Sequence, residues 1–271
     1  MFIDSACAGT KSNAISVLAA NNVIVKNIWA ENINQGVESH GRVSNLLVSD
    51  IFISGSDTFA LSVQPSVGDW DAIHDISISN VMINNANVDN LGAAGVWVSG
   101  VKINVDKLNL DTTRGYGLKI TGTDITISNT IVKNTTGSGF YTYPPVLNTT
   151  VCKRIIFDNC KALNNGGAGF EFKFTTGSGV FHGLVYNVAS GSDGIKIVDS
   201  HNITIMGTTI IDDRTPQLTT YDVGSYTSGS VDYVSVTGND FSLGKKLLGL
   251  TGSTHMIIRS NLGITSEEYH P

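Results

Sequence analysis

Side chains able to act as acids, bases or charge partners recur at one point of a short repeated strand pattern. Such a side chain follows a small residue and an apolar one in Gly117-Leu118-Lys119-Ile120, Gly139-Phe140-Tyr141-Thr142 and Gly169-Phe170-Glu171-Phe172. A lysine can neutralise a carboxylate, a tyrosine or lysine of lowered pKa can remove a proton, and a carboxyl group can serve as acid, base or nucleophile. We therefore predict Lys119, Tyr141 and Glu171 as catalytic residues.

Aromatic and charged side chains surround these three in the pattern. Trp97 occupies the same point one repeat earlier, and Tyr143 and Lys173 follow two residues after Tyr141 and Glu171. Aromatic rings stack on sugar rings and charged groups fix hydroxyls or carboxylates, so we predict that Trp97, Tyr143 and Lys173 bind a sugar chain. The alternative interpretation is structural, because aromatic residues favour strands and Lys–Glu neighbours pair across strands for solubility.

Segments that interrupt the pattern extend this prediction. Long loops on a rigid scaffold are where binding residues usually lie, so Asp69, Trp70 and Asp71 in the first interruption are predicted to contact substrate as well. We expect loop insertions near 65–74, 144–153, 174–180 and 212–230. The first three leave from one corner of the repeat and are expected to wall one side of the site. The fourth lies at a different edge near the C-terminal end.

The repeat itself predicts the elements that position these residues. A small residue, often glycine, precedes a short alternating strand whose first apolar position falls at residues 15, 37, 61, 96, 118, 140, 170 and 195. The shorter steps define a period of about 22 residues. A second alternating strand in each repeat ends at a residue that tolerates the left-handed conformation and can hydrogen-bond to the next turn. These corner residues are Asn27, Asp50, Asn80, Asn129 and Asn159.

Such a unit cannot bury its apolar side alone, so successive units must stack into a continuous core. We predict one all-β domain over 1–271, a parallel β-helix of about nine or ten turns. In the first strand of each unit the residues between the inward apolar ones face outward and stack into a column. That column runs Ser16, Glu38, Ser62, Trp97, Lys119, Tyr141, Glu171 and Lys196.

The pattern resembles the right-handed parallel β-helix superfamily of pectate lyases, polygalacturonases and phage tailspikes. The ending Met256-Ile257-Ile258-Arg259-Ser260-Asn261-Leu262-Gly263 is similar to the closing turn of related phage and bacterial proteins. The resemblance implies recognition of a polysaccharide, with cleavage by a lyase or a glycoside hydrolase, outside the cell or on a virion surface. Such proteins usually begin with a helix that caps the barrel. Here the repeat starts near Ala14, so we expect a missing N-terminal domain, a homotrimer or a partner to cover that end.

Charge, hydropathy and cysteine content exclude several other classes of protein. The net charge of -6 opposes general nucleic-acid binding, and no apolar run reaches the roughly 18 residues that cross a bilayer. Cys7, Cys152 and Cys160 form neither a disulfide framework nor a zinc motif. No cluster of acids predicts calcium, so we expect neither a metal nor a cofactor.

The sequence does not decide which reaction, if any, these residues catalyse. A glycosidase needs two neighbouring carboxyl groups, and Glu38 and Glu171 lie five turns apart, about 24 Å at the usual strand spacing. We interpret Asp193 and Asp199, beside Lys196, as turn residues and a surface ion pair. The scarcity of paired acids favours a second hypothesis, a non-catalytic shaft or adhesin segment that binds a surface glycan or a protein.

Overall fold

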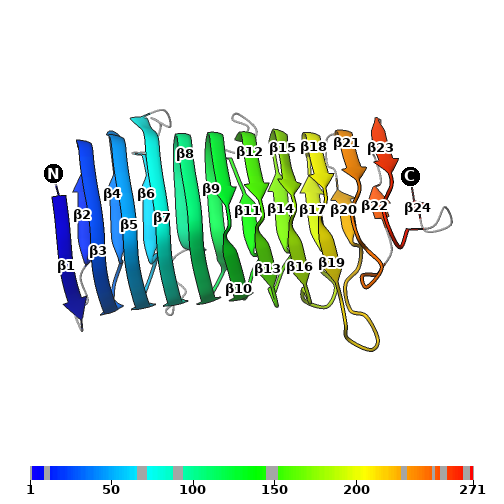
Figure 1. Ribbon diagram of the computed structural model, residues 1–271, viewed down its shortest axis with the longest axis horizontal. Helices are drawn as coiled ribbons and strands as arrows, with labels where there is room; N and C mark the ends of the chain where they lie inside the picture. Colours follow the sequence, from blue (N-terminus) through cyan, green and yellow to red (C-terminus); the bar gives the residue numbers. More distant parts are fainter. Residues whose placement is uncertain are drawn as a thin grey trace.

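The computed structural model describes residues 2–8, 13–65, 72–87, 94–144, 152–226, 231–245, 248–250, 255–264 and 269–270. The chain winds into an elongated solenoid whose turns stack side by side from the N-terminal to the C-terminal end (Figure 1). Every strand pair in the described ranges is parallel, and no α-helix occurs in them. The fold is therefore the predicted all-β parallel solenoid, with about nine turns.

Three parallel ladders make up the solenoid, and we call them the first, second and third faces. The first face is the predicted site face, and it also includes residues 94–99 of β8 and 116–121 of β9. Its separate strands are β2 (Ile15–Leu18), β4 (Val37–His40), β6 (Leu61–Gln64), β11 (Phe140–Thr142), β14 (Phe170–Lys173), β17 (Ile195–Val198), β20 (Val223–Tyr226), β22 (Leu248–Leu250) and β24 (Tyr269–His270).

Long strands turn from one face onto the next in the N-terminal half. They are β3 (Asn21–Ile33), β5 (Val43–Ser56), β7 (Ile73–Ala86), β8 (Ala94–Thr113) and β9 (Tyr116–Ser128), with β1 (Phe2–Ala8) paired alongside β3. Later turns use separate strands. The second face has β12 (Cys152–Asp158), β15 (Thr175–Phe181), β18 (His201–Met206), β21 (Asp232–Thr237) and β23 (Met256–Arg259). The third face has β10 (Ile131–Thr135), β13 (Lys161–Leu163), β16 (Leu184–Tyr186) and β19 (Thr209–Ile211).

Alternation of apolar and polar residues explains why these strands form a core. In β5 the side chains of Val43, Leu46, Val48, Ile51 and Ile53 are buried inside the coil. Their polar neighbours face outward, because successive side chains in a strand point to opposite sides. Each turn stacks its apolar residues on those of the next turn, so the core is continuous along the solenoid.

The predicted corner residues adopt the left-handed conformation. Asn27, Asp50, Asn80, Asn129 and Asn159 have φ values of 49° to 56°. Their side chains also bond between turns. Asn80 Nδ2 donates to Asp50 Oδ1 at 2.6 Å, and Asn159 Nδ2 donates to Asn129 Oδ1 at 2.8 Å. Short Asn and Asp side chains therefore limit the backbone strain at the corner and link successive turns.

The expected insertions differ in part from the structure. The segment 174–180, expected as a loop, belongs largely to the second-face strand β15, which pairs with β12 and β18. Its glycines and hydroxyl residues concealed the alternation, although Ser178 and Val180 point inward and are buried. Strands β7 and β12 likewise begin inside the expected insertions, and β20 lies inside the fourth.

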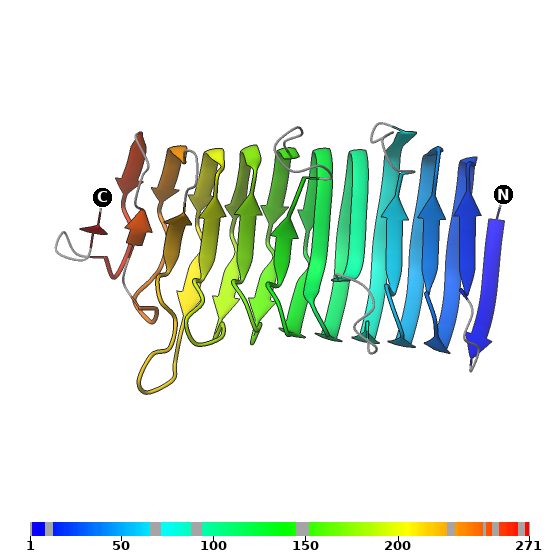
Figure 2. The ribbon, with the colours of Figure 1, turned by 180° about the vertical axis from the view of Figure 1, so that it is seen from behind.

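The segment between β19 and β20 projects from the solenoid in both views (Figures 1 and 2). Asp212, which is buried, fixes its base. One carboxylate oxygen of Asp212 accepts hydrogen bonds from the backbone N–H groups of Leu218 and Thr219, at 2.7 and 2.8 Å. In the part of the chain that the structure describes, no helix has the length and apolar character to cross a membrane.

Candidate functional site

The predicted outward column on the first face is confirmed by the strand register. Trp97 pairs with Lys119, Lys119 with Tyr141, Tyr141 with Glu171, and Glu171 with Lys196. Strands of neighbouring turns lie about 4.8 Å apart, so side chains longer than this spacing lean on one another. How exposed each side chain of the column is therefore depends on which side chains lie beside it.

Lys119 lies in an aromatic cage. Its Nζ is 3.7 Å from the ring centre of Trp97 and 5.2 Å from that of Tyr143. Only 8% of Lys119 is exposed, and this burial lowers the pKa of its ammonium group to about 8. Cation–π attraction compensates for part of the lost hydration.

Tyr141 is covered in the same way. Its ring stacks on that of Tyr116, with centroids 4.0 Å apart and an interplanar angle of 16°. The two side chains are also hydrogen-bonded, and burial raises the pKa of the Tyr141 hydroxyl far above its ordinary value. We call Trp97, Lys119, Tyr141, Tyr143 and Tyr116 the aromatic cluster. It forms a largely closed layer on the first face.

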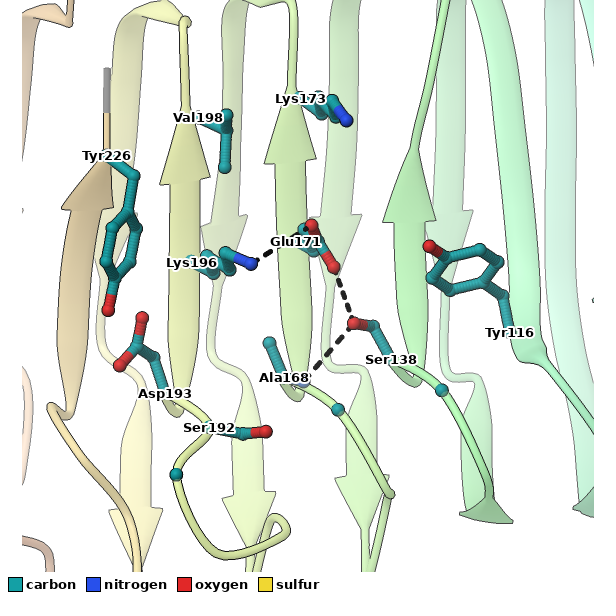
Figure 3. Close-up of a pocket in the computed structure, with 13 residues that line it drawn as sticks. Tyr116, Ser138, Ala168, Glu171, Lys173, Ser192, Asp193, Lys196, Val198 and Tyr226 are labelled. Carbon is teal, nitrogen blue, oxygen red and sulfur yellow. Dashed lines mark hydrogen bonds and ion pairs between the residues drawn. The ribbon is translucent and has the colours of Figure 1, made fainter. Parts of the chain in front are cut away.

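An open hollow of about 560 Å³ lies next to the aromatic cluster, towards the C-terminal end (Figure 3). We call it the Glu171 hollow, and β14, β17 and β20 carry most of its functional side chains. It is lined by Tyr116, Gly137, Ser138, Gly167, Ala168, Glu171, Lys173, Gly191, Ser192, Asp193, Lys196, Val198 and Tyr226.

Glu171 is held firmly at the centre of this hollow. Its Oε1 lies 3.6 Å from Nζ of Lys196, one turn further on. Its Oε2 accepts a hydrogen bond of 2.6 Å from the Ser138 hydroxyl, which in turn accepts one from the Ala168 backbone N–H (Figure 3). The Lys196 ammonium and the Ser138 hydroxyl therefore hold the Glu171 carboxyl group in place.

Asp193 lies in the same hollow but is buried. Only 2% of Asp193 is exposed, and this burial raises the pKa of its carboxyl group to about 6. The nearby charge of Glu171 raises it further, whereas a hydrogen bond from Tyr226 and the charge of Lys196 oppose the shift. Its Oδ1 is buried without a hydrogen-bond partner among the described residues. An unpartnered buried carboxylate oxygen favours the protonated form.

Tyr226 connects Asp193 with the open part of the hollow. The Tyr226 hydroxyl is hydrogen-bonded to Asp193, while 39% of the residue is exposed. Its ring also packs near Lys196, whose Nζ is 5.5 Å from the ring centre. The hollow therefore combines two carboxyl groups, two lysines and an exposed aromatic ring.

Sequence reasoning treated Asp193 as a turn residue and missed its place beside Glu171. The register that aligns Phe140, Phe170 and Ile195 also aligns the residues two positions earlier. This second column, which lines the hollow, contains Tyr116, Ser138, Ala168 and Asp193. The signal was present in the repeat, because each of these residues directly precedes the small residue that opens the strand.

The predicted site residues thus fall into three groups. Glu171 and Lys173 line the Glu171 hollow, and Lys173 Nζ lies 5.5 Å from the Tyr143 ring centre. Trp97, Tyr143, Lys119 and Tyr141 form the adjoining aromatic cluster. Asp69, Trp70 and Asp71 lie outside the described residues. No cluster of three or more His, Cys, Asp or Glu side chains with metal-binding geometry occurs in the described ranges.

The sequence defines the class of protein to which this solenoid belongs. Residues 79–263 match the family model described as a right handed beta helix region, which covers more than half of the chain. The chain therefore belongs to this family. Among curated proteins, none matches the sequence.

Solved structures are similar in fold. The A-module of the Azotobacter vinelandii mannuronan C-5 epimerase AlgE6 aligns with a TM-score of 0.69 and 13% identity, over 93% of this chain and 65% of the module. This chain thus spans about two thirds of that module's length. The AlgE4 A-module of the same organism gives 0.44 and 10%, over 98% and 91%, and the Dettilon tailspike protein gives 0.33 and 10%, over 93% and 61%. At such identities the likeness concerns the fold alone.

Proposed function

We propose that the protein binds a polysaccharide across its first face and hydrolyses it in the Glu171 hollow. One observation carries this proposal: two carboxyl groups share the hollow, Glu171 in contact with Lys196 and Ser138, and Asp193 buried with a raised pKa. Glycoside hydrolysis uses a pair of carboxyl groups, one as a general acid and the other as a base or nucleophile.

The surroundings of the pair support an extended sugar ligand. The exposed ring of Tyr226 offers a stacking surface, and Lys173 and Lys196 offer donors to hydroxyls or carboxylates. A solenoid presents such groups along its length, which suits a chain-like ligand. The similar AlgE6 module is named for mannuronan, so the fold is compatible with a polysaccharide ligand.

The hydrolytic step follows from the different exposure of the two acids. When Asp193 is protonated, its O–H donates to the Tyr226 oxygen, and the exposed Tyr226 hydroxyl turns to the substrate. The proton then passes from Asp193 to the Tyr226 oxygen while the Tyr226 hydroxyl proton moves to the glycosidic oxygen. The bond between the anomeric carbon and that oxygen then breaks. Water attacks the anomeric carbon, and Glu171 accepts its proton. Exchange with solvent returns a proton to Asp193 and removes one from Glu171.

Reducing-end release from a panel of neutral and acidic polysaccharides tests the proposal. General acid–base groups contribute about 10²- to 10⁴-fold, so Glu171→Gln and Asp193→Asn should each lower kcat by such a factor while the polysaccharide still binds. Glu38→Gln is the matched control, because Glu38 occupies the same outward column many turns away. Equal loss of activity in the control, or full activity in Glu171→Gln, would refute the assignment.

The pH dependence supplies an independent readout. Asp193 has to be protonated to act as an acid, and its pKa is raised to about 6 by burial. We therefore expect kcat/KM to fall as the pH rises above about 6. In Tyr226→Phe, which interrupts the proton path, kcat should fall and its decline above pH 6 should flatten. An alkaline optimum in the parent would contradict an Asp193 acid.

The alternatives are outcomes of the same assay. Products that carry a new carbon–carbon double bond would indicate a lyase, for which Lys119 and Tyr141 were predicted from the sequence as charge partner and base. Binding without any product would indicate an adhesin or shaft. The proposed place of action is outside the cell or on a virion surface, where polysaccharides are accessible, and a homotrimer remains a prediction for ultracentrifugation.

A further inference from the structure

A strained tyrosine marks a different part of the molecule, at the start of the second face. From β3 to β21 the residue at this corner has a positive φ, and the strand register aligns these residues from turn to turn. They are Asn22, Asn45, Asp75, Lys102, Asp124, Arg154, Gly177, Asn202 and Tyr233. Most are Asn, Asp or Gly, which tolerate this conformation. A bulky aromatic residue does not, so Tyr233 with φ of 53° is strained.

Core packing does not compensate for this strain, because 54% of Tyr233 is exposed. Its ring instead stacks face to face on His255, with centroids 4.5 Å apart and an interplanar angle of 5°. Asp232 holds both partners, since its Oδ1 accepts the Tyr233 backbone N–H at 3.0 Å and lies 2.8 Å from His255 Nδ1. Strain that is retained at the surface is typical of functional sites.

The stacked pair borders a hollow of about 650 Å³ on the second face. Thr204 and Ser235 add hydroxyl groups to its lining, Asn202 adds an amide, and Met256 and Ile257 add apolar surface. Among the described residues that line it, the charged candidate is His255, whose Nδ1 already faces Asp232. An aromatic wall, small hydroxyls and no unbalanced charge suit an uncharged sugar ring.

We propose that this hollow, bordered by Tyr233 and His255, binds a neutral pyranose residue of a glycan. It is separate from the Glu171 hollow, because β18, β21 and β23 line it whereas β14, β17 and β20 carry most of the functional side chains of the other. The exposed ring stacks on the apolar face of the sugar, and Thr204 and Ser235 bond to its hydroxyls. The inference therefore goes beyond the proposed hydrolysis and does not require it.

Calorimetric titration tests the site with three neutral probes, the hexasaccharides of β-1,4-glucose, β-1,4-N-acetylglucosamine and α-1,4-glucose. The measurements use a Glu171→Gln background, which blocks the proposed cleavage. We expect one of the probes to bind, with affinity reduced at least tenfold in Tyr233→Asn and largely kept in Tyr233→Phe. Asn is the residue type found at other turns of this corner, so Tyr233→Asn should fold with an equal or higher Tm.

A second variant separates this site from the first. Tyr226→Ala removes the exposed ring of the Glu171 hollow, and it should leave the part of the probe binding that Tyr233→Asn removes unchanged. Loss of probe binding in Tyr226→Ala but not in Tyr233→Asn would assign the sugar to the Glu171 hollow and overturn the inference. Failure of all three probes to bind would also overturn it, whereas the hydrolytic proposal is tested by product release.

Discussion

Lys119 is the residue whose protonation most directly links the stability of this fold to pH, because its ammonium group is buried. Burial lowers its pKa from 10.5 to about 8, so the unfolded chain binds a proton more tightly than the folded chain does. Between pH 8 and 10.5 the unfolded state carries more protons, and the free energy of unfolding therefore rises with pH in this window. Below pH 8 both states are protonated, and the full penalty of the buried charge remains.

Lys119→Met tests this argument, because methionine keeps much of the chain length without the charge. The variant relieves a penalty of about 3 kcal/mol but loses cation–π attraction of about 2 kcal/mol, so we expect a net gain of about 1 kcal/mol at pH 7. The rise in stability between pH 8 and 10.5 should disappear. Thermal unfolding at pH 7, 9 and 10.5 measures both effects, and identical pH profiles for the parent and the variant would contradict them.

At the scale of single elements, the corners between strands decide how well a turn fits its neighbours. The register places Lys107 at the corner held by Asn80 in the preceding turn and Asn129 in the following one. Lys107 has φ of 55°, a conformation that costs an ordinary L-residue about 1 kcal/mol or more. Asn tolerates it and could also extend the amide ladder between turns.

Lys107→Asn should therefore raise the free energy of unfolding by about 1 kcal/mol. Denaturant titration measures the change. Lys161→Asn is the matched control, since Lys161 is also an exposed lysine of the third face and does not have a positive φ. The control should be neutral or slightly destabilising. An equal gain in both variants would show that loss of a lysine, and not relief of the corner, is responsible.

The strands and corners also explain how much of the structure could be predicted from the sequence. Alternation and the corner amides are local signals, so the parallel solenoid and the left-handed Asn and Asp residues could be predicted. Exposure along the outward column could not, because it depends on contacts between turns. Lys119 and Tyr141 are covered by Trp97, Tyr143 and Tyr116, whereas Glu171 stays at an open hollow. Asp193 was missed because the predicted column began after the small residue of each repeat, and Asp193 directly precedes Gly194.

For the whole molecule, the decisive property is that each turn contacts only the turns beside it. The middle of the core is rich in aromatic rings. Phe140 stacks on Phe170 with centroids 4.7 Å apart, and Phe157 packs edge-on against both. These three buried rings join the turns that carry the aromatic cluster and the Glu171 hollow. The stability of the site is therefore set by contacts inside the coil beneath it.

Phe170→Ala removes the ring at the centre of this stack and should destabilise the fold by about 3 to 5 kcal/mol. Because coupling is between nearest neighbours, the loss should be local. Hydrogen exchange should accelerate in β11, β14 and β17, while β3 and β5, several turns away, keep most of their protection. Phe52→Ala is the matched control, since Phe52 lies on the outer surface against Trp29 and is not part of the core. Uniform acceleration along the whole chain in Phe170→Ala would mean that the solenoid unfolds as one cooperative unit, and the nearest-neighbour account would then fail.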